Sequence, residues 1–401
     1  MTELRRSGAA QQDDAPLANT LLYLMLMLIL AASLAIFVYG MTAAMLGTIL
    51  PDLSARFHLT PKQNGAIAFS QAVGLILASI GVGPLIDYEG KKIGLVLGLS
   101  LSALAVALLP RSNGFRAITS YLFLLGTGGG VIVTAANALG SDVTPDHRAT
   151  ALNLLNIFFG IGGFATPFVS ANLLGKSSKR LCYLIASLAA AAVVINAVAP
   201  IPRPTHAQSF VFSQIGSVLD QPVLWLCAFL LFLYVACEVG VWNWLVQHLI
   251  AQGIPQVRAL NILSFGFALG LLLGRLGASE ILISVRGLSV TLAASVLMTI
   301  MTFLMLRTRN PTVAWILTFL AGMSCAPVFP TTIALIGDRI PRMTGTAIGI
   351  AVTASWIGLA VSSRVIGSIA AGDPARLKKA LLVIPGMSVI MILVNLALIK
   401  T

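Results

Sequence analysis

The chain has 401 residues, of which 58% are hydrophobic and only 9% are charged, and its mean hydropathy is +0.95. Soluble proteins carry about a quarter charged residues, so this composition excludes a soluble domain and indicates a membrane protein. The net charge of +12 comes from basic residues scattered among loops, which fits lipid headgroups better than a nucleic-acid surface. The 4 cysteines lie in apolar runs without a Cys-x-x-Cys or Cys/His pairing, so we expect no disulfide framework, no metal site and no cofactor.

Breaks in hydropathy divide the chain into apolar segments, and a membrane-spanning helix needs about 20 apolar residues. The segments that we expect to span the bilayer are 20–50, 64–86, 92–110, 116–141, 149–175, 180–200, 223–251, 259–281, 287–306, 312–337, 344–371 and 378–399. This pattern predicts an all-α membrane protein with twelve transmembrane helices in two six-helix bundles, residues 1–200 and 223–401, joined by a polar linker at 201–222. The polar residues 1–14 lead into an apolar run that is too long for a signal peptide, so we expect the chain to be inserted whole.

The two predicted bundles repeat each other in sequence. The link after the fourth span, "GSDVTPDHRATALNLL" (140–155), and the link after the tenth span, "IGDRIPRMTGTAIGI" (336–350), share an Asp, a Pro three residues later and a basic residue before a helix rich in small residues. Many secondary transporters use repeated halves to build a central site that opens to each side of the membrane in turn. The repeat therefore favours a transporter, and no P-loop, nucleophile elbow or His-Glu-x-x-His motif suggests an enzyme.

The loop "GPLIDYEGKK" (83–92) after the second span resembles the signature of the major facilitator superfamily, although Tyr88 stands where that family usually has a basic residue. A glycine at Gly83 lets a helix of the other half approach closely, and Asp87 can pair with a basic residue or a helix N-terminus. The resemblance implies a monomer in the cell inner membrane or plasma membrane, with this loop, the 201–222 linker and both termini in the cytoplasm. The residues expected to act in conformational gating are Gly83, Asp87, Gly90, Lys91 and Arg148.

Within that superfamily, four stretches resemble the fucose/glucose permease branch of sugar:proton symporters. They are "GTILPDLSARFHLTPKQNG" (47–65), "TAAN" (134–137), "YVACEVGVWNWL" (234–245) and "GMSCAPVFPTTIAL" (322–335). The resemblance implies transport of a monosaccharide by alternating access, with the small-molecule substrate and the lipid bilayer as partners. The acids that carry the proton in that branch are missing, because Val133 and Gly47 stand at their positions. Proton symport through those residues is therefore excluded.

Glu238 is the one carboxylate that the sequence places deep inside a span, since the other twelve acids fall at termini or loop ends. An unpaired carboxylate in a membrane either takes up a proton or finds a partner. We count Arg275 with the basic residues near the ends of spans, which leaves Arg364 as the only base well inside one. A Glu238–Arg364 ion pair is the sharpest hypothesis that follows. Two roles for Glu238 then stay open. It is either the proton-coupling residue of a symporter, which carries the proton, or one partner of a permanent ion pair that holds two helices together.

Sugars bind to aromatic faces with polar side chains at their rim. Glu238 and Trp242 share one helix face, whereas Trp244 and Gln247 share another. For Trp244 an interfacial anchor is an equal alternative, and for Tyr39 and Trp356 helix packing competes with ligand contact. The residues expected to bind substrate are Tyr39, Asn137, Glu238, Trp242, Asn243, Gln247, Trp356 and Arg364.

Two other functions stay open at this point. One is an organic-anion or drug transporter in which Arg364 holds an anionic substrate. The other is a transporter-like receptor or lipid-handling protein that moves no solute. The sequence does not choose among substrates, coupling ions or directions of transport.

Overall fold

The computed structural model describes residues 2–59, 61–143, 145–175, 177–202, 212–370 and 374–400, with side chains described from residue 26 onward except at scattered positions. The first half contains α1 (Thr2–Phe57), α2 (Pro61–Tyr88), α3 (Lys91–Leu108), α4 (Phe115–Val143), α5 (Arg148–Asn172) and α6 (Ser178–Val198), followed by the short α7 (Phe212–Leu219). The second half contains α8 (Pro222–Ala251), α9 (Gln256–Asn261), η3 (Ile262–Ala268), α10 (Leu269–Ser284), α11 (Gly287–Arg307), α12 (Pro311–Cys325), α13 (Val328–Arg339), α14 (Thr344–Ala370), α15 (Pro374–Leu381) and α16 (Val383–Lys400).

The prediction of an all-α membrane protein is confirmed, because 12 helical segments of the described chain are long and apolar enough to cross a bilayer. Two spans are less regular than expected. The eighth begins as α9 and continues through η3, a π-helical stretch, into α10. The tenth is divided into α12 and α13 at Pro327, whose ring leaves no backbone N–H to continue the helix.

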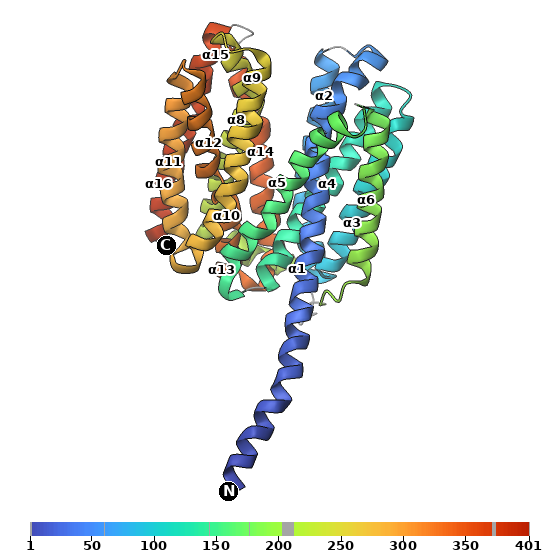
Figure 1. Ribbon diagram of the computed structural model, residues 1–401, viewed down its shortest axis with the longest axis vertical. Coiled ribbons are helices and arrows are strands. Elements are labelled where there is room, and N and C mark those ends of the chain that lie inside the picture. The colour runs from blue at the N-terminus through green and yellow to red at the C-terminus, as the bar shows by residue number, and fades with distance from the viewer. Residues whose placement is uncertain are drawn as a thin grey trace.

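Figure 1 shows the helices in two groups, α1–α6 and α8–α16, which approach each other at the lower end and stand apart at the upper end. The lower end carries the loops 89–90 and 285–286 and is here called the motif end. The upper end carries the loops 112–114 and 252–255 and is here called the far end. Helix α1 extends beyond the bundle at the motif end, and α16 runs toward that end and stops beside the other helices of its group.

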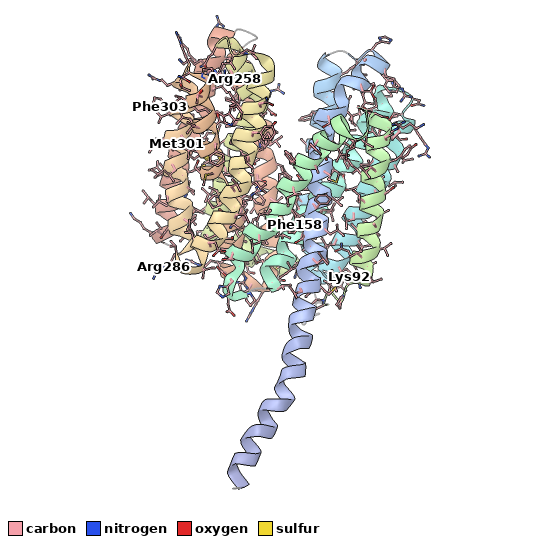
Figure 2. All side chains as sticks on the ribbon, in the orientation of Figure 1. Lys92, Phe158, Arg258, Arg286, Met301 and Phe303 are labelled. Atoms are coloured by element: carbon pink, nitrogen blue, oxygen red, sulfur yellow. The ribbon has the colours of Figure 1, made fainter. Side chains whose placement is uncertain are left out.

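Large apolar side chains cover the outside of both groups. Figure 2 shows Phe303 pointing outward from α11, where it is 38% exposed, while Lys92 lies at the motif end and Arg258 at the far end. An apolar belt between two charged ends is what a bilayer requires, because its hydrocarbon core hydrates no charge.

The internal repeat predicted from the sequence is confirmed by helix contacts. In the first half α2 meets α4 backbone to backbone where Gly74 faces the Phe123 carbonyl, and in the second half α10 meets α12 where Gly270 faces the Phe319 carbonyl. The two glycines and the two carbonyls are separated by the same number of residues. Small residues at such contacts let membrane helices approach closely.

The pairs α1–α5 and α8–α14 correspond in the same way. Thr166 on α5 donates a hydrogen bond to the Met41 carbonyl at 3.1 Å, and Ser362 on α14 donates to the Ala236 carbonyl at 2.6 Å. Each half is therefore one copy of the same packing scheme, and residues of the two copies can be matched one to one near these contacts.

Candidate functional site

The loop that carries the signature docks onto the other half through Asp87. One carboxylate oxygen accepts a hydrogen bond from the Gly345 N–H at 2.9 Å, and the other accepts from the Thr346 N–H and hydroxyl, each at 2.7 Å. These donors belong to the first turn of α14, where backbone N–H groups have no partner within the helix and the helix dipole favours a negative charge. Asp87 thus holds the N-terminus of α14 against the end of α2.

Gly83 lies one turn from Asp87 at the same contact. A Cβ atom on Gly83 would lie 2.7 Å from Thr346 Cα and 2.8 Å from the Gly345 carbonyl oxygen, and both of those atoms are backbone. Any larger residue would push α2 away from α14. Gly90 adopts φ of 100°, in the region that favours glycine, and ends the turn before α3.

Further contacts join the halves at the motif end. Arg148 donates to Asp338 at 2.6 Å across the halves and to the Ser141 carbonyl at 2.8 Å within its own half. Lys91 instead pairs with Asp142 of its own half at 2.8 Å and lies 4.0 Å from Asp87. The five residues expected to gate the transporter therefore all lie at or beside the contact between the halves.

Aromatic side chains of both halves meet at the middle of the bundle. Tyr39 on α1 stacks on Phe159 of α5 with ring centroids 5.4 Å apart, and its edge meets Trp356 of α14 at 6.5 Å. The Trp356 indole N–H donates to the Ser79 hydroxyl on α2 at 3.2 Å. Tyr39 and Trp356 are thus brought together, with further partners on α2 and α5.

Glu238 lies on α8 and acts on the same region through its charge. Its carboxylate is close enough to interact electrostatically with the hydroxyls of Tyr39 and Tyr234 and with the Cys325 thiol. Tyr234 packs against Phe329 of α13 at a centroid distance of 6.4 Å. Glu238 itself is partly exposed. We call Tyr39, Ser79, Phe159, Tyr234, Glu238, Arg275, Phe329 and Trp356 the central site.

The placement of Arg275 near the end of a span, as expected from the sequence, is wrong. Arg275 lies inside α10 and is only 3% exposed. Its Nη1 donates to the Asn156 carbonyl of α5 at 2.7 Å, and its guanidinium carbon lies 5.8 Å from the centre of the Phe159 ring. Gly274 packs against α12 at Met323, which turns the next residue toward the first half. The base deep inside the bundle is therefore Arg275.

The expected Glu238–Arg364 ion pair does not form. The ion pairs among the described side chains join Lys91 to Asp87 and Asp142, and Arg148 to Asp338. Helices α8 and α14 touch where Ser362 bonds the Ala236 carbonyl. Each charged residue comes two positions later on its helix, about 200° around the axis, so both side chains point away from this contact. Arg364 is exposed, eight residues beyond Trp356 toward the far end.

The remaining predicted residues are spread around the central site. Asn137 is fully buried, and its amide oxygen accepts from the Asn156 side chain at 3.1 Å, so it supports the helix turn that Arg275 contacts. Trp242 is 37% exposed and meets Phe267 of η3 edge to face at 5.3 Å. Asn243 is exposed, and the side chain of Gln247 lies outside the described residues, as does Gly47.

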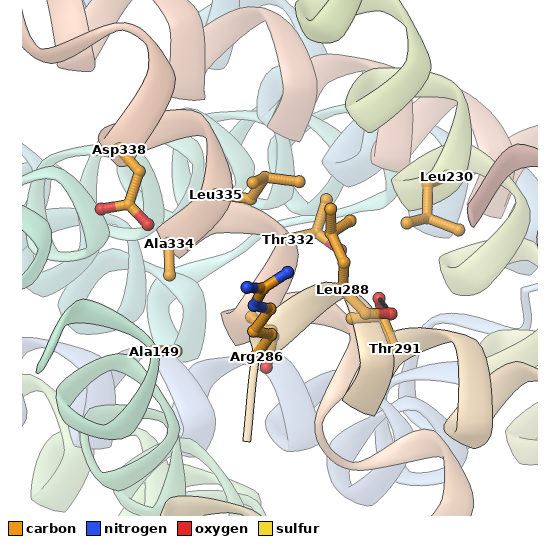
Figure 3. A pocket seen from close by; sticks show the side chains of 11 residues that line it. Ala149, Leu230, Arg286, Leu288, Thr291, Thr332, Ala334, Leu335 and Asp338 are labelled. Atoms are coloured by element: carbon orange, nitrogen blue, oxygen red, sulfur yellow. Dashed lines mark hydrogen bonds between the residues drawn. The ribbon is translucent and has the colours of Figure 1, made fainter. Parts of the chain in front are cut away.

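A cavity of about 260 Å³ lies apart from the central site, at the motif end of the second half. Figure 3 shows the Arg286 side chain beside it, with Thr332, Leu335 and Asp338 around it. Asp338 is the partner of Arg148, so this cavity adjoins the contact between the halves. None of its lining residues belongs to the central site or to the residues predicted to bind substrate.

Two repeated helical halves, with charged and aromatic side chains meeting between them, are the architecture of a multi-pass membrane transporter. The sequence pattern of the Major Facilitator Superfamily matches residues 32–363, so the chain belongs to that superfamily.

Known proteins similar to this chain are transporters and not enzymes. A 4-hydroxybenzoate transporter of Pseudomonas aeruginosa is 29% identical over 149 residues, which is 37% of this chain and 33% of that protein. A glucose/galactose transporter of Brucella abortus is 26% identical over 236 residues, 54% of this chain and 57% of that protein. The chain thus spans between a third and somewhat over half of these two relatives. The crystal structure of the E. coli fucose:proton symporter superposes with a TM-score of 0.79 at 18% identity, covering 92% of this chain and 98% of that one, and shows the same fold.

Proposed function

We propose that the chain is a secondary transporter that carries a small polar organic solute of monosaccharide size by alternating access, with the solute bound in the central site. The glucose/galactose relative supports a sugar-sized substrate. The site contains the kinds of group that such a solute needs, since the aromatic rings of Tyr39, Phe159 and Trp356 cluster there and Glu238 is a hydrogen-bonding side chain.

The observation that carries this proposal is the place of the bonds between the halves. The described hydrogen bonds and ion pairs that join the halves run from the central site to the motif end, from Trp356–Ser79 to Asp87–Thr346 and Arg148–Asp338. A transporter closed on one side of its site is one of the two states that alternating access requires. In the proposed cycle these bonds break when the halves rock and the motif end opens.

Gly83, Asp87, Gly90, Lys91 and Arg148 are the gating residues of this proposal, because they build the contact that must open. With the motif end in the cytoplasm, as the superfamily signature implies, both termini are cytoplasmic and the structure is outward-facing. The membrane is then a cell inner membrane or plasma membrane.

Glu238 is the proposed proton carrier. It lies in the central site within electrostatic reach of two tyrosine hydroxyls, and the described side chains give it no ion pair within 4.0 Å. A carboxylate so placed can alternate between its charged and neutral forms as the site opens to each side.

Counterflow in proteoliposomes tests the proposed function. Liposomes with purified protein are loaded with one unlabelled solute at high concentration and diluted into a trace of the same labelled solute, for a panel of hexoses and hexose acids. A transporter produces transient accumulation of label for at least one solute, because the two fluxes share one site. No accumulation for any solute would contradict the proposal and favour a receptor or lipid-handling protein.

A further inference from the structure

We propose that Arg275 binds a carboxylate group of the transported solute, so that the central site takes a small organic monocarboxylate such as a sugar acid. The inference rests on the proposed function, since it assumes that the central site holds the solute. It adds the chemical group that the site recognises.

The first observation is that the Arg275 guanidinium is buried and forms no ion pair within 4.0 Å among the described side chains. The side chain is 3% exposed, and its Nε is buried without a hydrogen-bond partner among the described residues. Its Nη1 donates a hydrogen bond to the Asn156 carbonyl, and none of the described ion pairs includes Arg275. A guanidinium taken out of water is strongly unfavourable unless an anion or several acceptors replace its hydration.

The second observation is where the guanidinium lies. Arg275 extends from α10 of the second half to α5 of the first, so its group sits between the halves and not within the packing of one. Phe159, which lies beside the guanidinium, also stacks on Tyr39. A carboxylate bound at Arg275 would therefore have aromatic ring faces beside the rest of its molecule.

The third observation comes from the repeat. Arg275 follows Gly270 by the same number of residues that Ser79 follows Gly74, so Ser79 is its counterpart in the first half. Ser79 also contacts the other half, because its hydroxyl accepts a hydrogen bond from Trp356, but this side chain is small and uncharged. A serine at this position is thus enough for the packing of the first half. The cation in the other copy is an added feature that the fold does not require.

The charges of the site select a monoanion. Arg275 and Glu238 both interact electrostatically with Tyr234 and Cys325, so one positive and one negative group face the same small region. A dianion such as a phosphate ester carries about twice the charge of a carboxylate, so a single cation would leave half of that charge unbalanced and the repulsion from the Glu238 carboxylate would be about twice as large. One carboxylate can instead accept two parallel N–H bonds from a guanidinium, which is a strong and geometrically selective contact.

Binding of matched solutes to the full-length purified protein tests this proposal. The pairs are glucuronate with glucose, and benzoate with benzamide, so that each anion has a neutral relative of similar shape. Isothermal titration is done with the natural sequence, Arg275→Gln, Arg275→Lys, and Arg286→Gln as a control at an exposed arginine outside the site. Counterflow of the same four solutes is measured in parallel.

We expect at least one anion to bind about tenfold or more tightly than its neutral relative, since hydrogen bonds to charged groups contribute more than neutral ones. Arg275→Gln should abolish that preference, Arg275→Lys should restore part of it, and Arg286→Gln should leave it intact. If the protein prefers glucuronate to glucose, the natural solute is a hydroxylated acid. If it prefers benzoate to benzamide, the natural solute is an aromatic acid.

Equal binding of anion and neutral relative by the natural sequence would overturn the proposal, and this comparison does not depend on whether a variant folds. A preference that survives Arg275→Gln would overturn it as well. Counterflow of glucuronate and benzoate that Arg275→Gln leaves unchanged would refute the carboxylate subsite and uphold the proposed function. Absence of counterflow for all solutes would remove the proposed function itself.

Discussion

Asp87 and Thr346 stand on opposite halves of the chain, and the Asp87 carboxylate accepts hydrogen bonds from both the backbone N–H and the hydroxyl of Thr346. A third bond from the Gly345 N–H completes the capping of α14 by a residue of α2. Hydrogen bonds to a charged group contribute about 1.5–3 kcal/mol each, so this contact is among the strongest that must break when the motif end opens.

Asp87→Asn should therefore shift the protein toward a state that is open at the motif end, because the amide has lost both the charge and one acceptor atom. A loss of about 1.4 kcal/mol changes the ratio of the two states about tenfold. Spin labels on His147→Cys and Arg342→Cys, both exposed at the motif end, report the distance between the halves by electron paramagnetic resonance. Asp146→Asn is the matched control on an exposed acid. A distance distribution that Asp87→Asn leaves unchanged would show that the Asp87 contact does not hold the motif end closed.

Gly83→Ala should slow transport, because its new Cβ would meet the Thr346 and Gly345 backbone atoms at less than 3.0 Å. Overpacking of this kind destabilises the closed contact by about 1–3 kcal/mol. Gly81→Ala provides a control on the same helix, since a Cβ there meets nothing within 4 Å. Initial counterflow rates measure both, and equal rates for the two variants would show that α2 does not need this close approach.

Trp356→Phe should weaken the contact between the halves by about 1 kcal/mol, the usual net contribution of one hydrogen bond. The variant keeps a ring beside Tyr39 but loses the N–H that donates to Ser79 at 3.2 Å. Ser79→Ala removes the acceptor of the same bond. In a double-mutant cycle on the spin-label distances, the double variant should differ little from either single one, and additive effects would mean that the two residues act separately.

Tyr39→Ala should lower solute affinity about tenfold, because it removes the ring that stacks on Phe159 at 5.4 Å and lies within electrostatic reach of Glu238. Tyr39→Phe keeps that ring and separates the contribution of the stack from that of the hydroxyl. Titration of the best solute of the counterflow panel gives both affinities. Unchanged affinity in Tyr39→Ala would place the solute elsewhere.

The fold and the contact at the motif end could be predicted because the signals are local. Long apolar runs can only be membrane helices in a chain of this composition, and Gly83 and Asp87 belong to a short motif whose chemistry points to a helix N-terminus. The repeated Asp and Pro of the links after the fourth and tenth spans likewise predicted two similar halves. The matching helix contacts at Gly74 and Gly270 confirm this prediction.

The partners across the central site could not be predicted, because they depend on helix faces and not on depth in the membrane. Glu238 and Arg364 were paired by depth alone, whereas the Ser362–Ala236 contact turns both away from each other. Arg275 was missed because it was counted with the basic residues near the ends of spans, although it lies inside α10, which continues to Ser284. Its spacing from Gly270, matched by Ser79 and Gly74, was the signal that could have revealed it.

The central claim, that Glu238 couples proton movement to solute movement in an alternating-access site, is tested most directly by one comparison in proteoliposomes. Accumulation driven by an imposed proton gradient and counterflow without a gradient are measured for the natural sequence, Glu238→Gln, and Glu280→Gln as a control on an exposed acid of α10. The account predicts that Glu238→Gln loses accumulation but keeps counterflow, while Glu280→Gln keeps both. Undiminished accumulation by Glu238→Gln would contradict it.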